Sequence, residues 1–81
     1  MTLRSIRRCL LKHDLEGLIR LGAPRDEYNN EAKLIWDALD PDMKAPALVE
    51  LIRDVFHKQF DGLSIYDYSA LMALATDILE G

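Results

Sequence analysis

The chain has 81 residues, of which 49% are hydrophobic and 30% charged, and its formal net charge is −4. A chain of this length forms one domain with a small core, because it buries only about 60% of the surface exposed by its unfolded form. The composition excludes a disordered chain. No apolar run approaches the roughly 18 residues of a transmembrane helix. The single cysteine excludes an internal disulfide. We therefore expect one domain over residues 1–81, without a membrane span and in the cytoplasm.

Charge is unevenly distributed along the chain. Residues 1–25 carry a net charge of +4, and residues 26–81 carry −8. The acidic majority disfavours nucleic acid as a partner, because phosphates require a basic footprint. The basic first segment is either a local nucleic-acid patch or, as we favour, a solvated helix face that complements the acidic remainder.

Apolar periodicity predicts the first helix over about residues 3–12, with Thr2 as its N-cap. Asp14 is predicted to cap a second, short helix. Gly22 stands where a residue of positive φ ends a helix, and Pro24 prevents continuation.

The next helix is predicted over residues 30–39, with Asn29 or Asn30 as its N-cap and Glu31 in its first turn. A longer helix follows from residue 45 or 46 to 60, with Pro46 at its first position. Ser64 and Asp67 then form a capping box for the last helix. The expected fold is all-α, a compact bundle-like domain of four to five largely antiparallel helices. Its predicted core comprises Leu10, Leu18, Ile19, Ile35, Trp36, Leu39, Leu48, Ile52, Val55, Phe56, Leu71, Ala75 and Ile78.

The segments "GLIRLGAPRDEYNNEAKLI" and "DVFHKQFDG" resemble a small bacterial all-helical family of unknown function, the YugE-like family. The matching residues are Gly17, Leu18, Ile19, Gly22, Pro24, Asp26, Glu27, Tyr28 and Glu31. Leu15 and Asn29 depart from the family pattern, which has Pro and Asp there. The resemblance covers roughly residues 10–60 and implies a helical fold and a bacterial origin, but no activity.

Four consecutive residues are candidates for partner binding, since helix punctuation does not require them: Arg25, Asp26, Glu27 and Tyr28. Such loops between capped helices present side chains at little entropic cost. Tyr66 is a further candidate, because it falls off the stripe of the last helix and aromatic residues are enriched at binding hot spots.

Nothing in the spacing of titratable residues requires catalysis, so we expect no enzyme and no cofactor. The alternative is a small metal-dependent enzyme that uses Asp26, Glu27 and Glu31, although the spacing of a calcium loop is absent. His13 and His57 are interpreted as surface or capping histidines, and Cys9 as a buried, inert thiol.

By elimination, the predicted function is binding of another protein, with the acidic surface attracting a basic partner. An immunity or antitoxin-like role is the most concrete version. The competing hypothesis is self-association, so we expect either a monomer or a weak homodimer.

Overall fold

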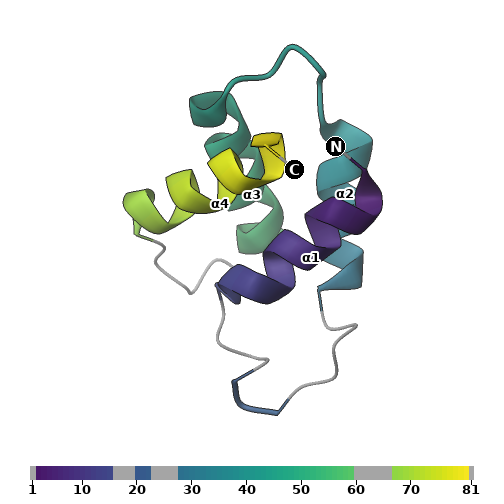
Figure 1. Cartoon of the computed structure of the whole chain (residues 1–81), viewed down its shortest axis with the longest axis vertical. Coiled ribbons are helices and arrows are strands. Elements are labelled where there is room, and N and C mark those ends of the chain that lie inside the picture. The colour runs from purple at the N-terminus through teal and green to yellow at the C-terminus, as the bar shows by residue number, and fades with distance from the viewer. Residues whose placement is uncertain (1, 16–19, 23–27, 60–66, 81) are drawn as a thin grey trace.

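The computed structural model of the chain describes residues 2–15, 20–22, 28–59 and 67–80. These residues form four helices and no strand: α1 (Leu3–His13), α2 (Asn29–Ala38), α3 (Ala45–Gln59) and α4 (Tyr68–Glu80). The predicted all-α class is therefore confirmed (Figure 1). No helix in these ranges is long and apolar enough to cross a bilayer.

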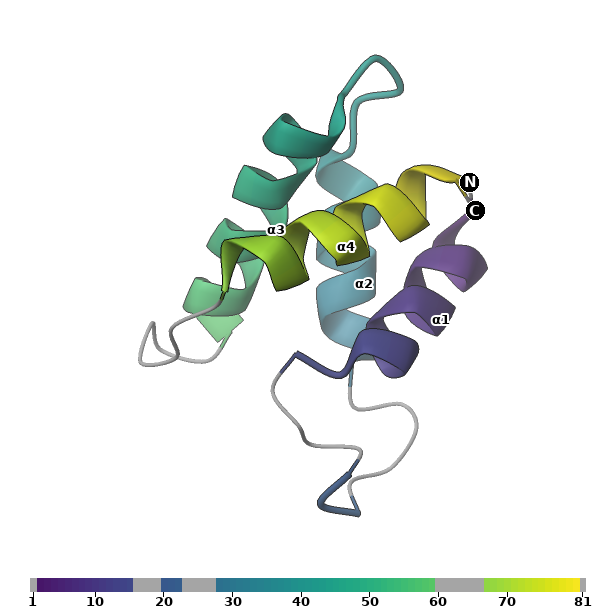
Figure 2. The same cartoon turned by 60° about the vertical axis from the view of Figure 1, so that its left-hand side comes forward.

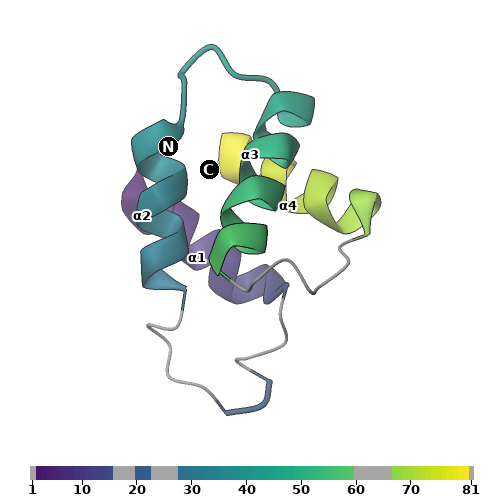
Figure 3. The same ribbon diagram turned by 180° about the vertical axis from the view of Figure 1, so that it is seen from behind.

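The four helices pack in a closed cycle, in which α1 and α3 each contact both α2 and α4. Helices α2 and α3 run in opposite directions from the connection at residues 39–44, whereas α4 lies across α3 in all three views (Figures 1, 2 and 3). The predicted antiparallel arrangement thus describes the α2–α3 pair and is not confirmed for the whole domain.

The core fills the space that the four helices enclose. The predicted core residues found buried are Leu10, Ile35, Leu48, Ile52, Val55, Phe56, Leu71, Ala75 and Ile78. Leu39 packs at the margin of this core. The core also includes Ile6, Cys9, Tyr28, Ala32, Val49 and Leu74. Leu18 and Ile19 fall outside the described residues.

The prediction that Trp36 belongs to the core is wrong, because its side chain is 40% exposed. Helix α2 buries Ala32 and Ile35 completely. Trp36 follows Ile35 directly, and successive helical residues point about 100° apart. Its position at the edge of the apolar stripe therefore turns much of the indole ring to solvent.

The predicted N-cap of α1 is confirmed. The predictions that Asp14 caps a second helix and that Asn29 or Asn30 caps α2 are wrong. The Thr2 hydroxyl accepts a hydrogen bond from the Ser5 amide at 3.0 Å, and the Ser5 hydroxyl accepts one from the Thr2 amide at 3.0 Å. Asp14 does not begin a helix: it ends α1 in the left-handed conformation, with φ 47°. The N-cap of α2 is Tyr28, whose side chain makes no capping hydrogen bond, rather than Asn29 or Asn30.

The remaining predicted boundaries are met in part. Gly22 has the expected positive φ, at 97°. Helix α3 begins at Ala45, so Pro46 occupies its second position, and α4 begins directly after Asp67. Ser64 and most of the predicted short second helix lie outside the described residues.

Candidate functional site

Of the five predicted partner-binding residues, the structure describes only Tyr28. Arg25, Asp26, Glu27 and Tyr66 lie outside the described residues, so their roles stay predictions. Tyr28 is 1% exposed and packs in the core, with its ring centroid 6.0 Å from that of Phe56. The prediction that Tyr28 contacts a partner is therefore wrong, because a side chain buried in its own domain offers no surface to another protein.

The hydroxyl of Tyr28 donates a hydrogen bond of 2.6 Å to Oδ1 of Asp14, which is also buried. The backbone amide of Arg20 donates to the other oxygen, Oδ2, at 3.2 Å. A buried carboxylate is tolerated only where hydrogen-bond donors of the protein replace the water molecules that would otherwise solvate it. Asp14 thus links the end of α1, the described turn at residues 20–22 and the start of α2.

Of the three carboxylates proposed for a metal, only Glu31 lies in the described part of the chain. Glu31 is only 6% exposed and lies in the first turn of α2, where the helix dipole favours an anion. Asp26 and Glu27 are outside the described residues. Within the described ranges, no group of three His, Cys, Asp or Glu residues is placed to hold a metal ion.

Exposed acidic residues follow Trp36 at the end of α2 and in the connection to α3. Trp36 is 40% exposed, and Leu34, about 200° away around the helix, is 37% exposed. Asp37, Asp40 and Asp42 are exposed, and we call these three residues the acidic corner. The last turn of α2 contains no basic residue, so the negative end of its dipole adds to the field of the acidic corner.

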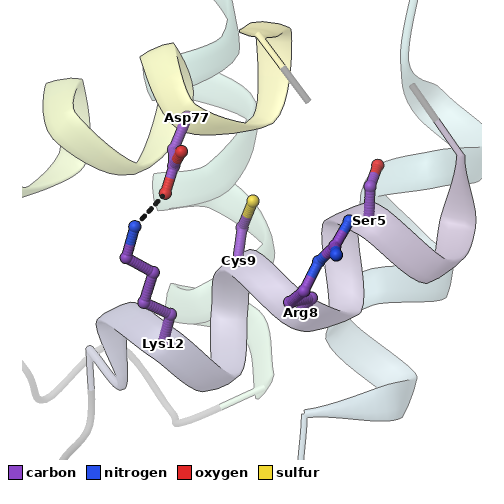
Figure 4. Close-up of a pocket in the computed structure, with 5 residues that line it drawn as sticks. All are labelled: Ser5, Arg8, Cys9, Lys12 and Asp77. Atoms are coloured by element: carbon purple, nitrogen blue, oxygen red, sulfur yellow. Dashed lines mark hydrogen bonds and ion pairs between the residues drawn. The ribbon is translucent and has the colours of Figure 1, made fainter.

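A shallow pocket of about 170 Å³ lies between α1 and α4, lined by Ser5, Arg8, Cys9, Lys12 and Asp77 (Figure 4). The Lys12 ammonium lies 3.4 Å from Oδ2 of Asp77. His13 Nε2 lies 2.9 Å from the same oxygen. These hydrogen bonds, with His13 first and Lys12 second, hold the pKa of Asp77 below its usual range.

Cys9 forms the floor of this pocket and is buried. Burial raises the pKa of its thiol, and the charge of Asp77 raises it further, whereas Arg8 and Lys12 lower it. A thiol of raised pKa is protonated at neutral pH and is a weak nucleophile. The Ser5 hydroxyl is engaged by the cap of α1 and donates to the Thr2 carbonyl at 2.9 Å. The residues lining the pocket therefore favour binding over covalent chemistry.

Sequence reasoning did not find this pocket, because Lys12 and Asp77 are 65 residues apart and no motif links them. The only available signal was that residues 4–12 contain four cations and no acidic residue. No protein-family model, curated protein or solved structure matches the chain.

Proposed function

We propose that this protein is a non-enzymatic binding domain that recognises a basic protein partner through Trp36 and the acidic corner. The observation that carries the proposal is the exposure of Trp36. This residue remains 40% accessible in the folded domain, although other apolar residues of α2 are buried in the core. Tryptophan is among the residues most enriched at binding hot spots.

The charge around Trp36 favours the sign of that partner. The acidic corner adds three carboxylates to the negative end of α2, of which Asp37 pairs with Lys33 at 3.9 Å. Lys44 is the one cation in the connection at residues 39–44. Complementary charge of this kind accelerates encounter and excludes partners of the wrong sign.

An immunity or antitoxin-like role, in which the partner is a basic toxin enzyme, is the most concrete form of this proposal. The loop residues Arg25, Asp26 and Glu27 and the aromatic Tyr66 are proposed to extend the contact.

The decisive experiment is quantitative affinity capture from the source cells, with the wild type beside three variants. We expect a basic protein that Trp36→Ala loses and that Tyr68→Ala retains, because Tyr68 is a comparably exposed aromatic residue on α4. Asp37→Asn combined with Asp40→Asn should weaken capture and make it less sensitive to salt. Retention of every partner by Trp36→Ala would refute the assigned surface.

Two further measurements separate the competing hypotheses. Light scattering at two concentrations tests self-association: a dimer that Trp36→Ala converts to a monomer assigns the surface to a second copy of the chain. Thermal unfolding with divalent cations tests the enzyme alternative. A melting temperature that rises with one cation, and loses this response in Asp26→Ala, contradicts a non-enzymatic role.

A further inference from the structure

Helix α1 carries a row of cations that the described contacts neutralise only in part. Arg4, Arg8 and Lys12 recur every four residues, so they lie on one face, about 6 Å apart along the axis. We call these three residues the basic stripe. Its middle and last members, Arg8 and Lys12, line the α1–α4 pocket.

The basic stripe contrasts with the cations of the other helices. Each Lys or Arg of α2 and α3 pairs with an acid on its own helix, as in Lys33–Asp37, Arg53–Glu50 and Lys58–Asp54. Helix α1 contains no acidic residue. Within the described part of the chain, Lys12 contacts Asp77, whereas Arg4 and Arg8 make no ion pair.

Except for Lys12, which stands in the last turn where the helix dipole favours a cation, this arrangement is unfavourable for α1 itself. Like charges four residues apart destabilise a helix by a few tenths of a kcal/mol per pair. Arg4 also stands in the first turn, where the helix dipole favours an anion. A row of cations that weakens its own helix, and that neighbouring side chains only partly neutralise, is suited to a ligand from outside the chain.

We propose that the basic stripe is a second binding surface, which takes an acidic segment of a partner polypeptide and admits one carboxylate into the α1–α4 pocket. In Figure 4 the Cys9 sulfur lies between the Arg8–Ser5 side of the pocket and the Lys12–Asp77 side. A carboxylate above this sulfur is flanked by the Arg8 guanidinium and the Lys12 ammonium. Lys12 then shares its charge between that carboxylate and Asp77.

Two features favour an acidic peptide over a nucleic acid. Alternate side chains of an extended peptide repeat at about 6.6 Å, close to the spacing of the basic stripe. A carboxylate ends a short side chain and enters a pocket, whereas a phosphodiester is internal to its chain and stays outside. This surface differs in place and sign from that around Trp36, so the two proposals stand or fall separately.

The test is calorimetric titration of the intact chain with an oligoglutamate peptide of about six residues, which spans the basic stripe. We expect Arg8→Gln to weaken binding about five- to tenfold, consistent with the loss of one charged hydrogen-bonding group. Arg53→Gln, which removes the same charge from α3, should leave binding within about twofold. Asp77→Asn removes the competing carboxylate and should tighten binding a few-fold. Circular dichroism verifies that each variant is folded.

Several outcomes overturn the proposal. One is an absence of oligoglutamate binding at millimolar concentration, and another is equal weakening by Arg8→Gln and Arg53→Gln. If Asp77→Asn binds the peptide as weakly as the wild type or more weakly, the α1–α4 pocket does not take part in peptide binding. A thymidine oligonucleotide of equal length that binds more tightly than the peptide assigns the surface to nucleic acid. If inorganic phosphate binds as tightly as the peptide, the basic stripe is only a site for small anions.

Discussion

The phenolic oxygen of Tyr28 lies 2.6 Å from Oδ1 of Asp14, and both residues are buried. Asp14 ends α1 and Tyr28 precedes α2, so one hydrogen bond joins the two residues that flank the segment 15–27. The predicted binding residues Arg25, Asp26 and Glu27 belong to that segment. The buried phenol–carboxylate pair therefore fixes the end of α1 against the start of α2.

Tyr28→Phe keeps the ring and removes the hydroxyl, so a buried carboxylate loses one of its donors. We expect a loss of about 1.5–3 kcal/mol in the free energy of unfolding, as for hydrogen bonds to charged groups. Urea denaturation measures this difference. Tyr68→Phe is the matched control, because Tyr68 is 51% exposed, and its effect should stay within about 0.5 kcal/mol. Equal effects would contradict the structural role of the Tyr28 hydroxyl.

Leu34 and Ile35 are neighbours of similar size, but only Ile35 is fully buried, whereas Leu34 is 37% exposed. Ile35→Ala should cost about 2–5 kcal/mol, since it leaves a cavity in the core. Leu34→Ala should cost roughly 1 kcal/mol or less. Thermal or urea unfolding of both variants checks the orientation of α2. If Leu34→Ala destabilised the protein more than Ile35→Ala, the described orientation of α2, and with it the exposure of Trp36, would be wrong.

Gly22 has φ 97°, and among the described residues no atom beyond its immediate chain neighbours lies within 4 Å of the position that a Cβ would take. Gly22→Ala therefore introduces backbone strain without a steric clash. We expect a loss of about 1–2 kcal/mol in unfolding free energy, typical of an L-residue forced to positive φ. A stabilising effect would mean that the backbone at this turn differs from the one described.

Cys9 should react slowly with iodoacetamide at neutral pH, because burial raises the pKa of its thiol. Asp77 raises this pKa and Arg8 lowers it, so their removal has opposite effects. Alkylation should be faster in Asp77→Asn and slower in Arg8→Gln, as followed by mass spectrometry against pH. Rate changes of the same sign in both variants would contradict this electrostatic arrangement.

The pKa of Asp77 is lowered in the folded protein, so this group stabilises the fold above the pKa that it has when unfolded. That contribution is lost as the pH falls through the lower, folded-state pKa. Asp77→Asn should therefore lose less stability than the wild type when the pH falls from about 5 toward 2. Unfolding curves across this range measure the difference. Parallel pH profiles would show that the contacts of Asp77 with His13 and Lys12 contribute nothing.

The sequence predicted the four described helices because apolar residues recur with helical spacing, and such stripes persist whatever they pack against. It placed Trp36 in the core because periodicity identifies a stripe but not which residue at its edge the neighbouring helices leave uncovered. Asp14 was misassigned because aspartate suits both a helix start and a left-handed helix end. The burial of Tyr28 depends on Asp14, a partner 14 residues away that no local pattern indicates.

Trp36 is the chain's single tryptophan and is partly exposed, which has an optical consequence. Indole emission moves to longer wavelength in water, so the native protein should already fluoresce like a partly hydrated indole. Unfolding will change this signal only modestly, whereas a partner that covers the end of α2 will shift the emission to the blue. The molecule therefore carries an intrinsic, label-free reporter that responds more to docking at this surface than to loss of the core.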